Sequence, residues 1–192
     1  DVDTCRAIAA AVLGDPKKAE FVPLNSQQRF AALQAGEVDI LTRNTTWNLT
    51  RDASLGLNFT TINYYDGQGF LVPRKIKVTS AKQLKGATIC TQAGTTNEKN
   101  VAEWSKAQGI PVKTVVFESF EASFKAFFSG RCQAFTTDTS ALAGLRNKEA
   151  PNPDDYLILP DLISKEPLAP AVKRGDDEWF AIVKWVPNAL IE

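Results

Sequence analysis

A chain of 192 residues suffices for one large domain or two small ones, and its 44% hydrophobic and 23% charged residues are ordinary for a globular protein. The 22 basic and 22 acidic residues cancel, and no basic stripe is interleaved with aromatic residues, which argues against a nucleic-acid partner. No apolar run approaches the roughly 20 residues that span a bilayer, and no signal peptide is visible.

The sequence contains three cysteines and no histidine. Without histidine, the commonest general base and the commonest metal ligand are both missing. The cysteines at positions 5, 90 and 132 are far apart and form no C-x-x-C pair, so neither a zinc site nor a dithiol redox centre is expected. We therefore expect no metal and no cofactor.

The first part of the chain predicts helices that alternate with strands. Residues 1–13 place apolar side chains at helical spacing, at Cys5, Ile8, Ala9 and Val12. Residues 20–24 predict a strand, 26–36 a short helix and 38–41 a buried strand, which indicates a parallel sheet. Because a domain rarely opens on an amphipathic helix with no strand to pack against, we expect that further residues precede Asp1.

The alternation restarts near residues 72–78. The remainder predicts strands at residues 87–91, 112–117 and 132–137, and helices at 80–86, 97–104, 120–128 and 138–145. Two extended stretches follow at 156–159 and 168–172, and a last helix is predicted at 176–191. Two alternating units of similar size predict an α/β fold with two lobes, each a doubly wound sheet.

We expect the final helix to return to the first lobe, because it has no partner of its own. Lobe 1 would then contain residues 1–72 and 165–192, and lobe 2 residues 73–164. The two crossings, near residues 71–73 and 159–164, would act as the hinge. Polar loops at 43–51 and 92–97 follow the carboxyl ends of predicted strands, where open α/β sheets bind ligands, so both should face one cleft.

Six stretches resemble the periplasmic amino-acid-binding subunits of ABC importers, in particular the general L-amino-acid and glutamate/glutamine-type group. They are residues 29–41, 43–47 with Arg51, 64–70, 92–96, 135–138 and 163–168. The resemblance implies a type II periplasmic-binding-protein-like fold, with a mixed sheet in each lobe. Members of this group begin earlier, with an export signal and a first strand, so this chain is expected to lack an N-terminal segment.

The resemblance also implies a function. The chain would be a monomeric, periplasmic solute-binding subunit that captures a free L-amino acid, polar or from a broad range, for an ABC permease, without catalysis. One alternative is an arogenate/prephenate dehydratase-like enzyme on the same fold, although the expected cleft loops offer no carboxylic acid beyond Asp138 and no histidine. Another is the ligand-sensing domain of a receptor, which would need membrane-spanning segments.

A free amino acid presents a carboxylate and an ammonium, and each needs a complement. Arg51 offers a planar fork for two charged hydrogen bonds, and the resemblance implies that it grips the α-carboxylate. The alternative is that Arg51 is a surface arginine without a role in binding, paired with Asp52 or Glu37. Residues 94–96 lie at a helix start and would form an anion site with Thr96 as a ligand contact, and the alternative is a plain threonine helix cap.

Asp138 ends one predicted strand and begins a helix. The resemblance implies that its carboxylate binds the ligand ammonium, and the alternative is that it caps its own helix. Asn44 and Thr46 would add neutral hydrogen bonds, and Arg43 and Gln92 are candidates for contacts with the ligand side chain.

The cysteines suggest one disulfide. Cys90 lies late in the strand before Gln92, and Cys132 begins the strand before Asp138. In a doubly wound lobe these strands can be neighbours at the Cα separation of about 5.5–6 Å that a disulfide needs. We therefore expect a Cys90–Cys132 bond, with the partner of Cys5 in the segment before residue 1.

Overall fold

The computed structural model describes residues 1–192, which divide into two compact units. Unit 1 contains residues 1–24, 28–65 and 167–192, and unit 2 contains residues 25–27 and 66–166. The expected boundary at residue 73 therefore shifts to residue 66. The reason is that residues 68–72 are fully buried and form a strand within the sheet of unit 2, so they cannot serve as an exposed linker.

Unit 2 is built on one five-stranded mixed sheet. Its strands are β3 (Gln68–Pro73), β4 (Thr88–Gln92), β5 (Lys113–Phe117), β6 (Ala134–Asp138) and β7 (Tyr156–Ile158), in the spatial order β5-β4-β6-β3-β7. Strand β4 runs parallel to β5 and β6, whereas β3 runs antiparallel to β6 and β7. This mixed α/β arrangement confirms the predicted fold class.

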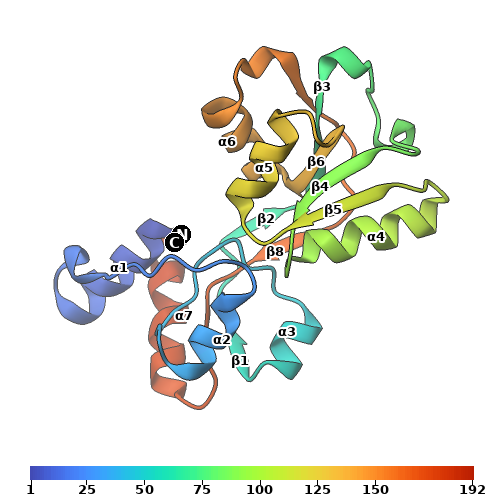
Figure 1. The fold of residues 1–192 in the computed structure, drawn as a ribbon. Coiled ribbons are helices and arrows are strands. Elements are labelled where there is room, and N and C mark those ends of the chain that lie inside the picture. Colours follow the sequence, from blue (N-terminus) through green and yellow to red (C-terminus); the bar gives the residue numbers. More distant parts are fainter. The chain divides into compact units, whose positions relative to one another are not determined.

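Helices cover both faces of this sheet, α4 (Thr96–Gln108) on one side and α5 (Phe120–Phe128) with α6 (Thr139–Glu149) on the other (Figure 1). Successive residues of a strand point to opposite faces. Phe70 thus packs in the same core as Val101 of α4, while Leu71 packs with Phe127 of α5 and Leu142 of α6. Both faces of β3 are covered, which explains its almost continuously apolar sequence.

Unit 1 contains four α-helices and one two-stranded sheet. The helices are α1 (Val2–Leu13), α2 (Gln28–Ala35), α3 (Leu49–Ser54) and α7 (Asp177–Ile191), and strand β1 (Leu57–Phe59) pairs antiparallel with β9 (Ala171–Lys173). Ile8 of α1 packs with Val183 of α7 and with Val172. The last helix belongs to unit 1, because this packing buries the apolar face that it presents. A single-turn 3-10 helix occurs in unit 1 at Pro16–Lys18, and three occur in unit 2, at Arg74–Ile76, Ala81–Gln83 and Pro153–Asp155.

Two strands predicted for unit 1 do not form. Residues 20–24 and 38–40 have no strand assignment, and Leu41 makes only an isolated antiparallel bridge with Ala171. A strand requires a neighbouring strand whose backbone groups complete its hydrogen bonds, and neither segment belongs to such a pair. Phe21 and Val22 are consequently half exposed, at 50% and 53%.

Apart from residues 25–27, the chain changes unit within two short strands, β2 (Tyr64–Asp66) and β8 (Glu166–Leu168), which pair with each other. The predicted crossings near residues 71–73 and 159–164 lie close to these strands but inside unit 2. No helix in the structure is both long and apolar enough to cross a membrane.

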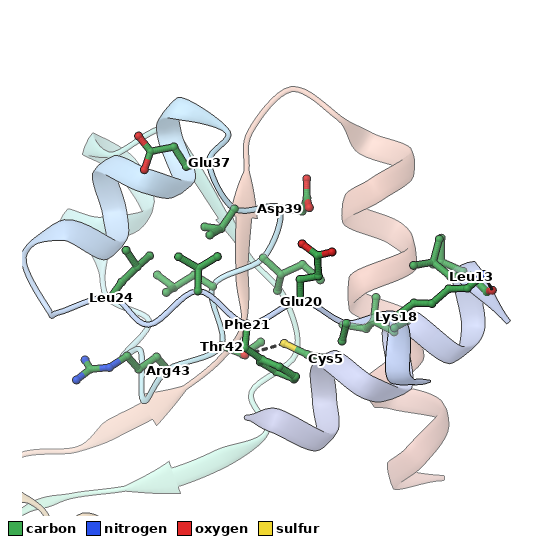
Figure 2. Close-up of a pocket in the computed structure, with 18 of the residues that line it drawn as sticks. Cys5, Leu13, Lys18, Glu20, Phe21, Leu24, Glu37, Asp39, Thr42 and Arg43 are labelled. Carbon is green, nitrogen blue, oxygen red and sulfur yellow. Dashed lines mark hydrogen bonds between the residues drawn. The ribbon is translucent and has the colours of Figure 1, made fainter. Parts of the chain in front are cut away.

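The Cys90–Cys132 disulfide is present, with a Cα–Cα distance of 5.7 Å, and this prediction is confirmed. Cys90 lies in β4 and pairs across the ladder with Phe135 of β6, which brings the two cysteines together. Cys5 carries a free, half-buried thiol whose Sγ lies 3.1 Å from Thr42 Oγ1 (Figure 2).

Removal of the disulfide should destabilise the protein without changing its fold. The bond closes a loop with a sequence separation of 42 residues, so the double variant Cys90→Ser/Cys132→Ser should lose about 2–4 kcal/mol of unfolding free energy. Urea denaturation followed by circular dichroism measures this loss. Cys5→Ser is the matched control, and an equal loss in that variant would contradict the assignment.

Candidate functional site

The candidate residues of unit 1 gather around the start of α3. Asn48 caps this helix, because its Oδ1 accepts a hydrogen bond from the Arg51 backbone N–H at 2.9 Å. The cap turns the Arg51 side chain back toward Thr46, whose carbonyl oxygen accepts a bond from Arg51 Nη1 at 2.9 Å. Arg51 is only 7% exposed, so its guanidinium is buried and held in a fixed direction.

An aromatic ring supports this guanidinium. Arg51 Cζ lies 5.0 Å from the ring centroid of Phe30, and Arg29 Cζ lies 4.8 Å from the same centroid, both within cation–π distance. Arg29 also donates from Nη1 to the Arg43 carbonyl at 2.6 Å and to Thr45 Oγ1 at 3.1 Å. Two buried positive groups therefore lie next to the loop that carries Asn44 and Thr46.

The alternative interpretation, in which Arg51 is a surface residue that forms an ion pair with Asp52 or Glu37, does not fit the burial of Arg51. Asp52 instead accepts a hydrogen bond from Trp47 Nε1 at 3.1 Å and pairs with Arg174 at 3.6 Å. The Trp47 ring stacks on Phe59 with a centroid distance of 5.8 Å, so this tryptophan is a packing residue.

The remaining unit 1 candidates differ in exposure. Thr46 is buried and bridges to Leu168, whereas Asn44 is exposed and adopts a left-handed backbone with φ of 32°, a conformation that asparagine tolerates. Burial lowers the pKa of the Arg43 guanidinium, although an arginine stays protonated at any physiological pH. Arg43 is thus a half-buried cation close to the other candidates.

In unit 2, the candidates lie at the carboxyl ends of the parallel strands β4 and β6. Gln92 ends β4, is buried, and donates from Nε2 to the Glu118 carbonyl at 3.3 Å. Thr96 is the first residue of α4, but the cap is Thr95, whose Oγ1 accepts from the Glu98 backbone N–H at 3.1 Å. A threonine therefore caps this helix, as the alternative interpretation of residues 94–96 held, and it is Thr95.

A buried glutamate engages the hydroxyl of Thr96. Glu166, 1% exposed, accepts from Thr96 Oγ1 at 3.0 Å and from Asn100 Nδ2 at 2.7 Å, and it also accepts from the Ser164 hydroxyl. Because a helix N-terminus carries a partial positive charge, the first turn of α4 stabilises this carboxylate. Glu166 therefore fixes the start of α4 against strand β8.

Asp138 ends β6 at the N-cap position of α6, yet its side chain makes no capping hydrogen bond. Its Oδ1 accepts from Asn97 Nδ2 at 2.9 Å, and only 4% of the residue is exposed. Asn97 lies next to Thr96 and, through its carbonyl, accepts from the buried Gln68 Nε2 at 3.0 Å. The structure thus links two predicted residues, Thr96 and Asp138, through a residue that was not predicted.

Asp66 caps α6 in place of Asp138. Its carboxylate accepts from Thr139 Oγ1 at 2.6 Å, from the Ser140 backbone N–H at 3.3 and 3.4 Å, and from the Ser140 hydroxyl. Burial alone would raise the pKa of Asp66, but the bonds from Ser140, Thr139 and Gly67 together outweigh it and lower the pKa. The cap is supplied from β2, which leaves the Asp138 carboxylate directed toward Asn97.

Sequence reasoning did not assign roles to four residues that organise this site, Phe30, Asp66, Asn97 and Glu166. Three of them lie within stretches that carry the family resemblance, although the resemblance did not reveal their contacts. Asn97 follows directly after such a stretch. Each contact joins segments far apart in the chain, as when Asp66 reaches Ser140, and no local pattern reports it.

A two-unit α/β chain with charged residues of opposite sign at its candidate sites has the form of a solute-binding protein. The whole chain, residues 1–192, matches the bacterial extracellular solute-binding proteins, family 3, and it belongs to that family. It is 52% identical over 191 residues to the general L-amino acid-binding periplasmic protein AapJ of Rhizobium johnstonii. It is 50% identical to the glutamate/glutamine/aspartate/asparagine-binding protein BztA of Rhodobacter capsulatus.

Each of these alignments covers 100% of this chain and 56% of the relative, so the chain spans just over half of their length. A solved structure described as an ABC transporter/periplasmic binding protein from Brucella ovis with glutathione bound is also similar. Its TM-score is 0.95 at 54% identity, over 98% of this chain and 59% of that one. These proteins are named as binding or transport proteins and not as enzymes.

The cap assignment gives a pH-dependent prediction. Asp66→Ala should lower the unfolding free energy by about 0.5–2 kcal/mol at pH 7, the usual cost of losing a helix cap. Because the pKa of Asp66 is lower in the folded state, this stabilisation is present above the unfolded-state pKa of about 4 and is lost as the pH falls through the folded-state pKa. Urea denaturation should therefore separate variant and parent more at pH 7 than at pH 3.

Glu103→Gln is the control for this experiment, since Glu103 is exposed on α4 and makes only a surface ion pair with Lys99 at 3.7 Å. It should leave the stability unchanged at both pH values. If Asp66→Ala behaved like this control, Asp66 would not cap α6.

Proposed function

We propose that this chain is the greater part of a periplasmic solute-binding subunit of an ABC importer, and that it captures a free L-amino acid. The observation that carries the proposal is a pair of pre-oriented, buried groups of opposite charge, Arg51 in unit 1 and Asp138 in unit 2. The zwitterionic end of an amino acid needs one cation and one anion. On this proposal, one amino acid would contact both groups.

Arg51 is proposed to bind the α-carboxylate. Its guanidinium is anchored at one edge by the Thr46 carbonyl and on one face by Phe30. A planar guanidinium binds a carboxylate through two parallel hydrogen bonds, which fixes the orientation of the bound group. Because the side chain is already fixed, binding would cost little side-chain entropy. Asn44 and Thr46 would add neutral contacts, and the first turn of α4 at Thr96 would add its positive dipole end.

Asp138 is proposed to bind the α-ammonium. Its carboxylate does not cap α6, and Asn97 holds one of its oxygens in place. A carboxylate accepts up to about four hydrogen bonds, so this geometry is compatible with an additional charged donor. Arg43 and Gln92 would contact the ligand side chain and thereby influence which amino acid is preferred.

A second ligand class deserves a direct test, because the similar Brucella structure is described with glutathione bound. In glutathione the γ-glutamyl residue keeps a free α-carboxylate and a free α-amino group. The groups proposed here would therefore recognise that end of the peptide as they would a free amino acid. The dehydratase alternative has no support among these relatives. The permease partner and the periplasmic location follow from the proposed function together with the names of the relatives.

Arg51→Ala should weaken the binding of every ligand, because all of them share the α-carboxylate. Loss of one partner of a buried charged pair costs about 2–5 kcal/mol, which is roughly 30-fold to several thousand-fold in Kd. Isothermal titration calorimetry of the full-length protein against the twenty amino acids and glutathione measures this change. Arg51→Lys should lose less than the alanine variant, since lysine keeps the charge but not the fork.

Arg174→Ala is the matched control, because Arg174 lies in the same unit and bonds to Asn58 and to the Asp52 and Leu57 carbonyls. It should leave the affinity unchanged, with circular dichroism confirming that both variants fold. An Arg51→Ala protein that binds its best ligand within threefold of the parent would defeat the carboxylate assignment.

Asp138→Asn tests the other half of the ligand. It keeps the shape of the side chain but removes the charge, so the affinity for amino acids should fall at least about 30-fold, the lower end of the range expected for a buried charged pair. A deaminated analogue such as glutarate lacks the ammonium, and its weak binding should not change. Calorimetry with glutamate and glutarate on parent and variant distinguishes these outcomes. Equal losses for both ligands would indicate a structural role for Asp138.

A further inference from the structure

Strand β3 begins with a polar residue at a position where the core is otherwise apolar. Gln68 is fully buried, as are Phe70, Leu71 and Val72 after it. Burial of a glutamine costs free energy unless the polar atoms of its amide find partners. The Gln68 Oε1 atom is buried and has no hydrogen-bond partner in the protein. Stability alone would therefore favour an apolar residue at this position.

The Gln68 amide nevertheless has a fixed orientation. Its Nε2 donates to Thr136 Oγ1 at 2.9 Å and to the Asn97 carbonyl at 3.0 Å. The Thr136 hydroxyl itself donates to the Gly69 carbonyl at 2.7 Å, so its oxygen accepts from Gln68. Both partners require the NH2 group of the amide, because an oxygen in that place would face the Asn97 carbonyl.

Asn97 connects this amide to Asp138. It is the second residue of α4, is 5% exposed, and donates from Nδ2 to Asp138 Oδ1 at 2.9 Å. A carbonyl in the first turn of an α-helix already accepts from the N–H four residues further on, so the bond from Gln68 is additional to that of the helix. This bond restricts the position of Asn97, and thereby the direction from which its amide reaches Asp138.

We propose that Gln68 is a positioning residue for amino-acid binding, which acts by holding Asn97, the residue that directs the Asp138 carboxylate toward the α-ammonium. The inference rests on the proposed function, because it requires Asp138 as the partner of the ammonium. A carboxylate that is held in one direction loses little further freedom when a ligand binds. Gln68 thus lowers the stability of β3 and increases the affinity of the site, a compromise that is common at functional positions.

The first test separates affinity from stability in the full-length protein. Gln68→Met keeps the length of the side chain but removes the amide. It should weaken glutamate binding at least about fivefold, the value of one typical hydrogen bond, as measured by calorimetry. Its Tm should stay within about 3 °C of the parent, because Thr136 keeps its bond to Gly69 and the Asn97 carbonyl keeps that of the helix.

Gln133→Met is the matched control. Gln133 is exposed, lies just before β6 at the end opposite Asp138, and accepts from the Thr88 backbone N–H at 2.7 Å. This variant also loses a hydrogen bond from a glutamine amide in unit 2, but it should leave the affinity for glutamate unchanged.

The second test asks whether Gln68 acts through Asn97. Asn97→Ala keeps the carbonyl that Gln68 contacts and removes only the link to Asp138. It should weaken glutamate binding roughly tenfold or more, since a hydrogen bond to a charged group is stronger than a neutral one. The double variant Gln68→Met/Asn97→Ala should then bind within about twofold of Asn97→Ala, whereas independent effects would multiply.

The parent and Asp138→Asn distinguish this inference from the proposed function. A parent that binds no amino acid, or an Asp138→Asn variant of unchanged affinity, would contradict the proposed function and this inference with it. If both behave as expected, unchanged affinity in Gln68→Met would overturn the positioning role alone. Losses that multiply in the double variant, or an equal loss for glutarate, which has no ammonium, would do the same. Gln68→Leu replaces Gln68→Met if that variant does not fold, and failure of both to fold would show that Gln68 is required for stability and overturn the proposal.

Discussion

The antiparallel pairing of β3 with β6 determines where the polar side chains of unit 2 lie. Its register sets Gln68 opposite Asp138 and Gly69 opposite Thr137. With this register, Asp66 at the end of β2 reaches the first turn of α6 and caps it. A shift of one residue would turn every side chain of β3 to the opposite face and remove both the cap and the packing of Phe70 and Leu71.

The same register explains why the Asp138 side chain does not cap its own helix. An aspartate at an N-cap position normally bonds to its own helix. Here the cap comes from Asp66 across the sheet, and Asn97 of α4 orients Asp138 instead. The different roles of the two aspartates, Asp66 as the cap of α6 and Asp138 as the partner of Asn97, thus depend on three segments that meet at one end of the sheet.

Much of unit 2 could be predicted because its signals are local. The phenylalanines at 120, 124 and 127 lie at helical spacing between Ser119 and Gly130, and helix α5 forms over residues 120–128 as expected. The disulfide followed from the adjacency of two strands in a doubly wound sheet. Capping of α6 by Asp66 and the bonds from Thr96 to Glu166 could not be predicted, since they join residues 73 and 70 positions apart.

In unit 1, by contrast, the local sequence predicted less of the structure. Residues 20–24 have the composition of a strand, but strand formation is a property of the pair and not of the segment alone. The residue spacing of α1 predicts that Cys5, Ile8, Ala9 and Val12 form one buried face, but only Ile8 and Ala9 are buried, and Val12 is 45% exposed.

The charged groups of the candidate site share one physical feature, which is that protein contacts fix them before any ligand is present. The Thr46 carbonyl and the Phe30 ring restrict Arg51, and Asn97 restricts Asp138. Pre-organisation of this kind reduces the entropic cost of binding and concentrates recognition on the groups that the protein has fixed. On the proposed function, those groups contact only the part that all amino acids share. Selectivity would then depend on residues such as Arg43 and Gln92. Related subunits could therefore change their preferred amino acid while the residues that bind the α-carboxylate and α-ammonium stay the same.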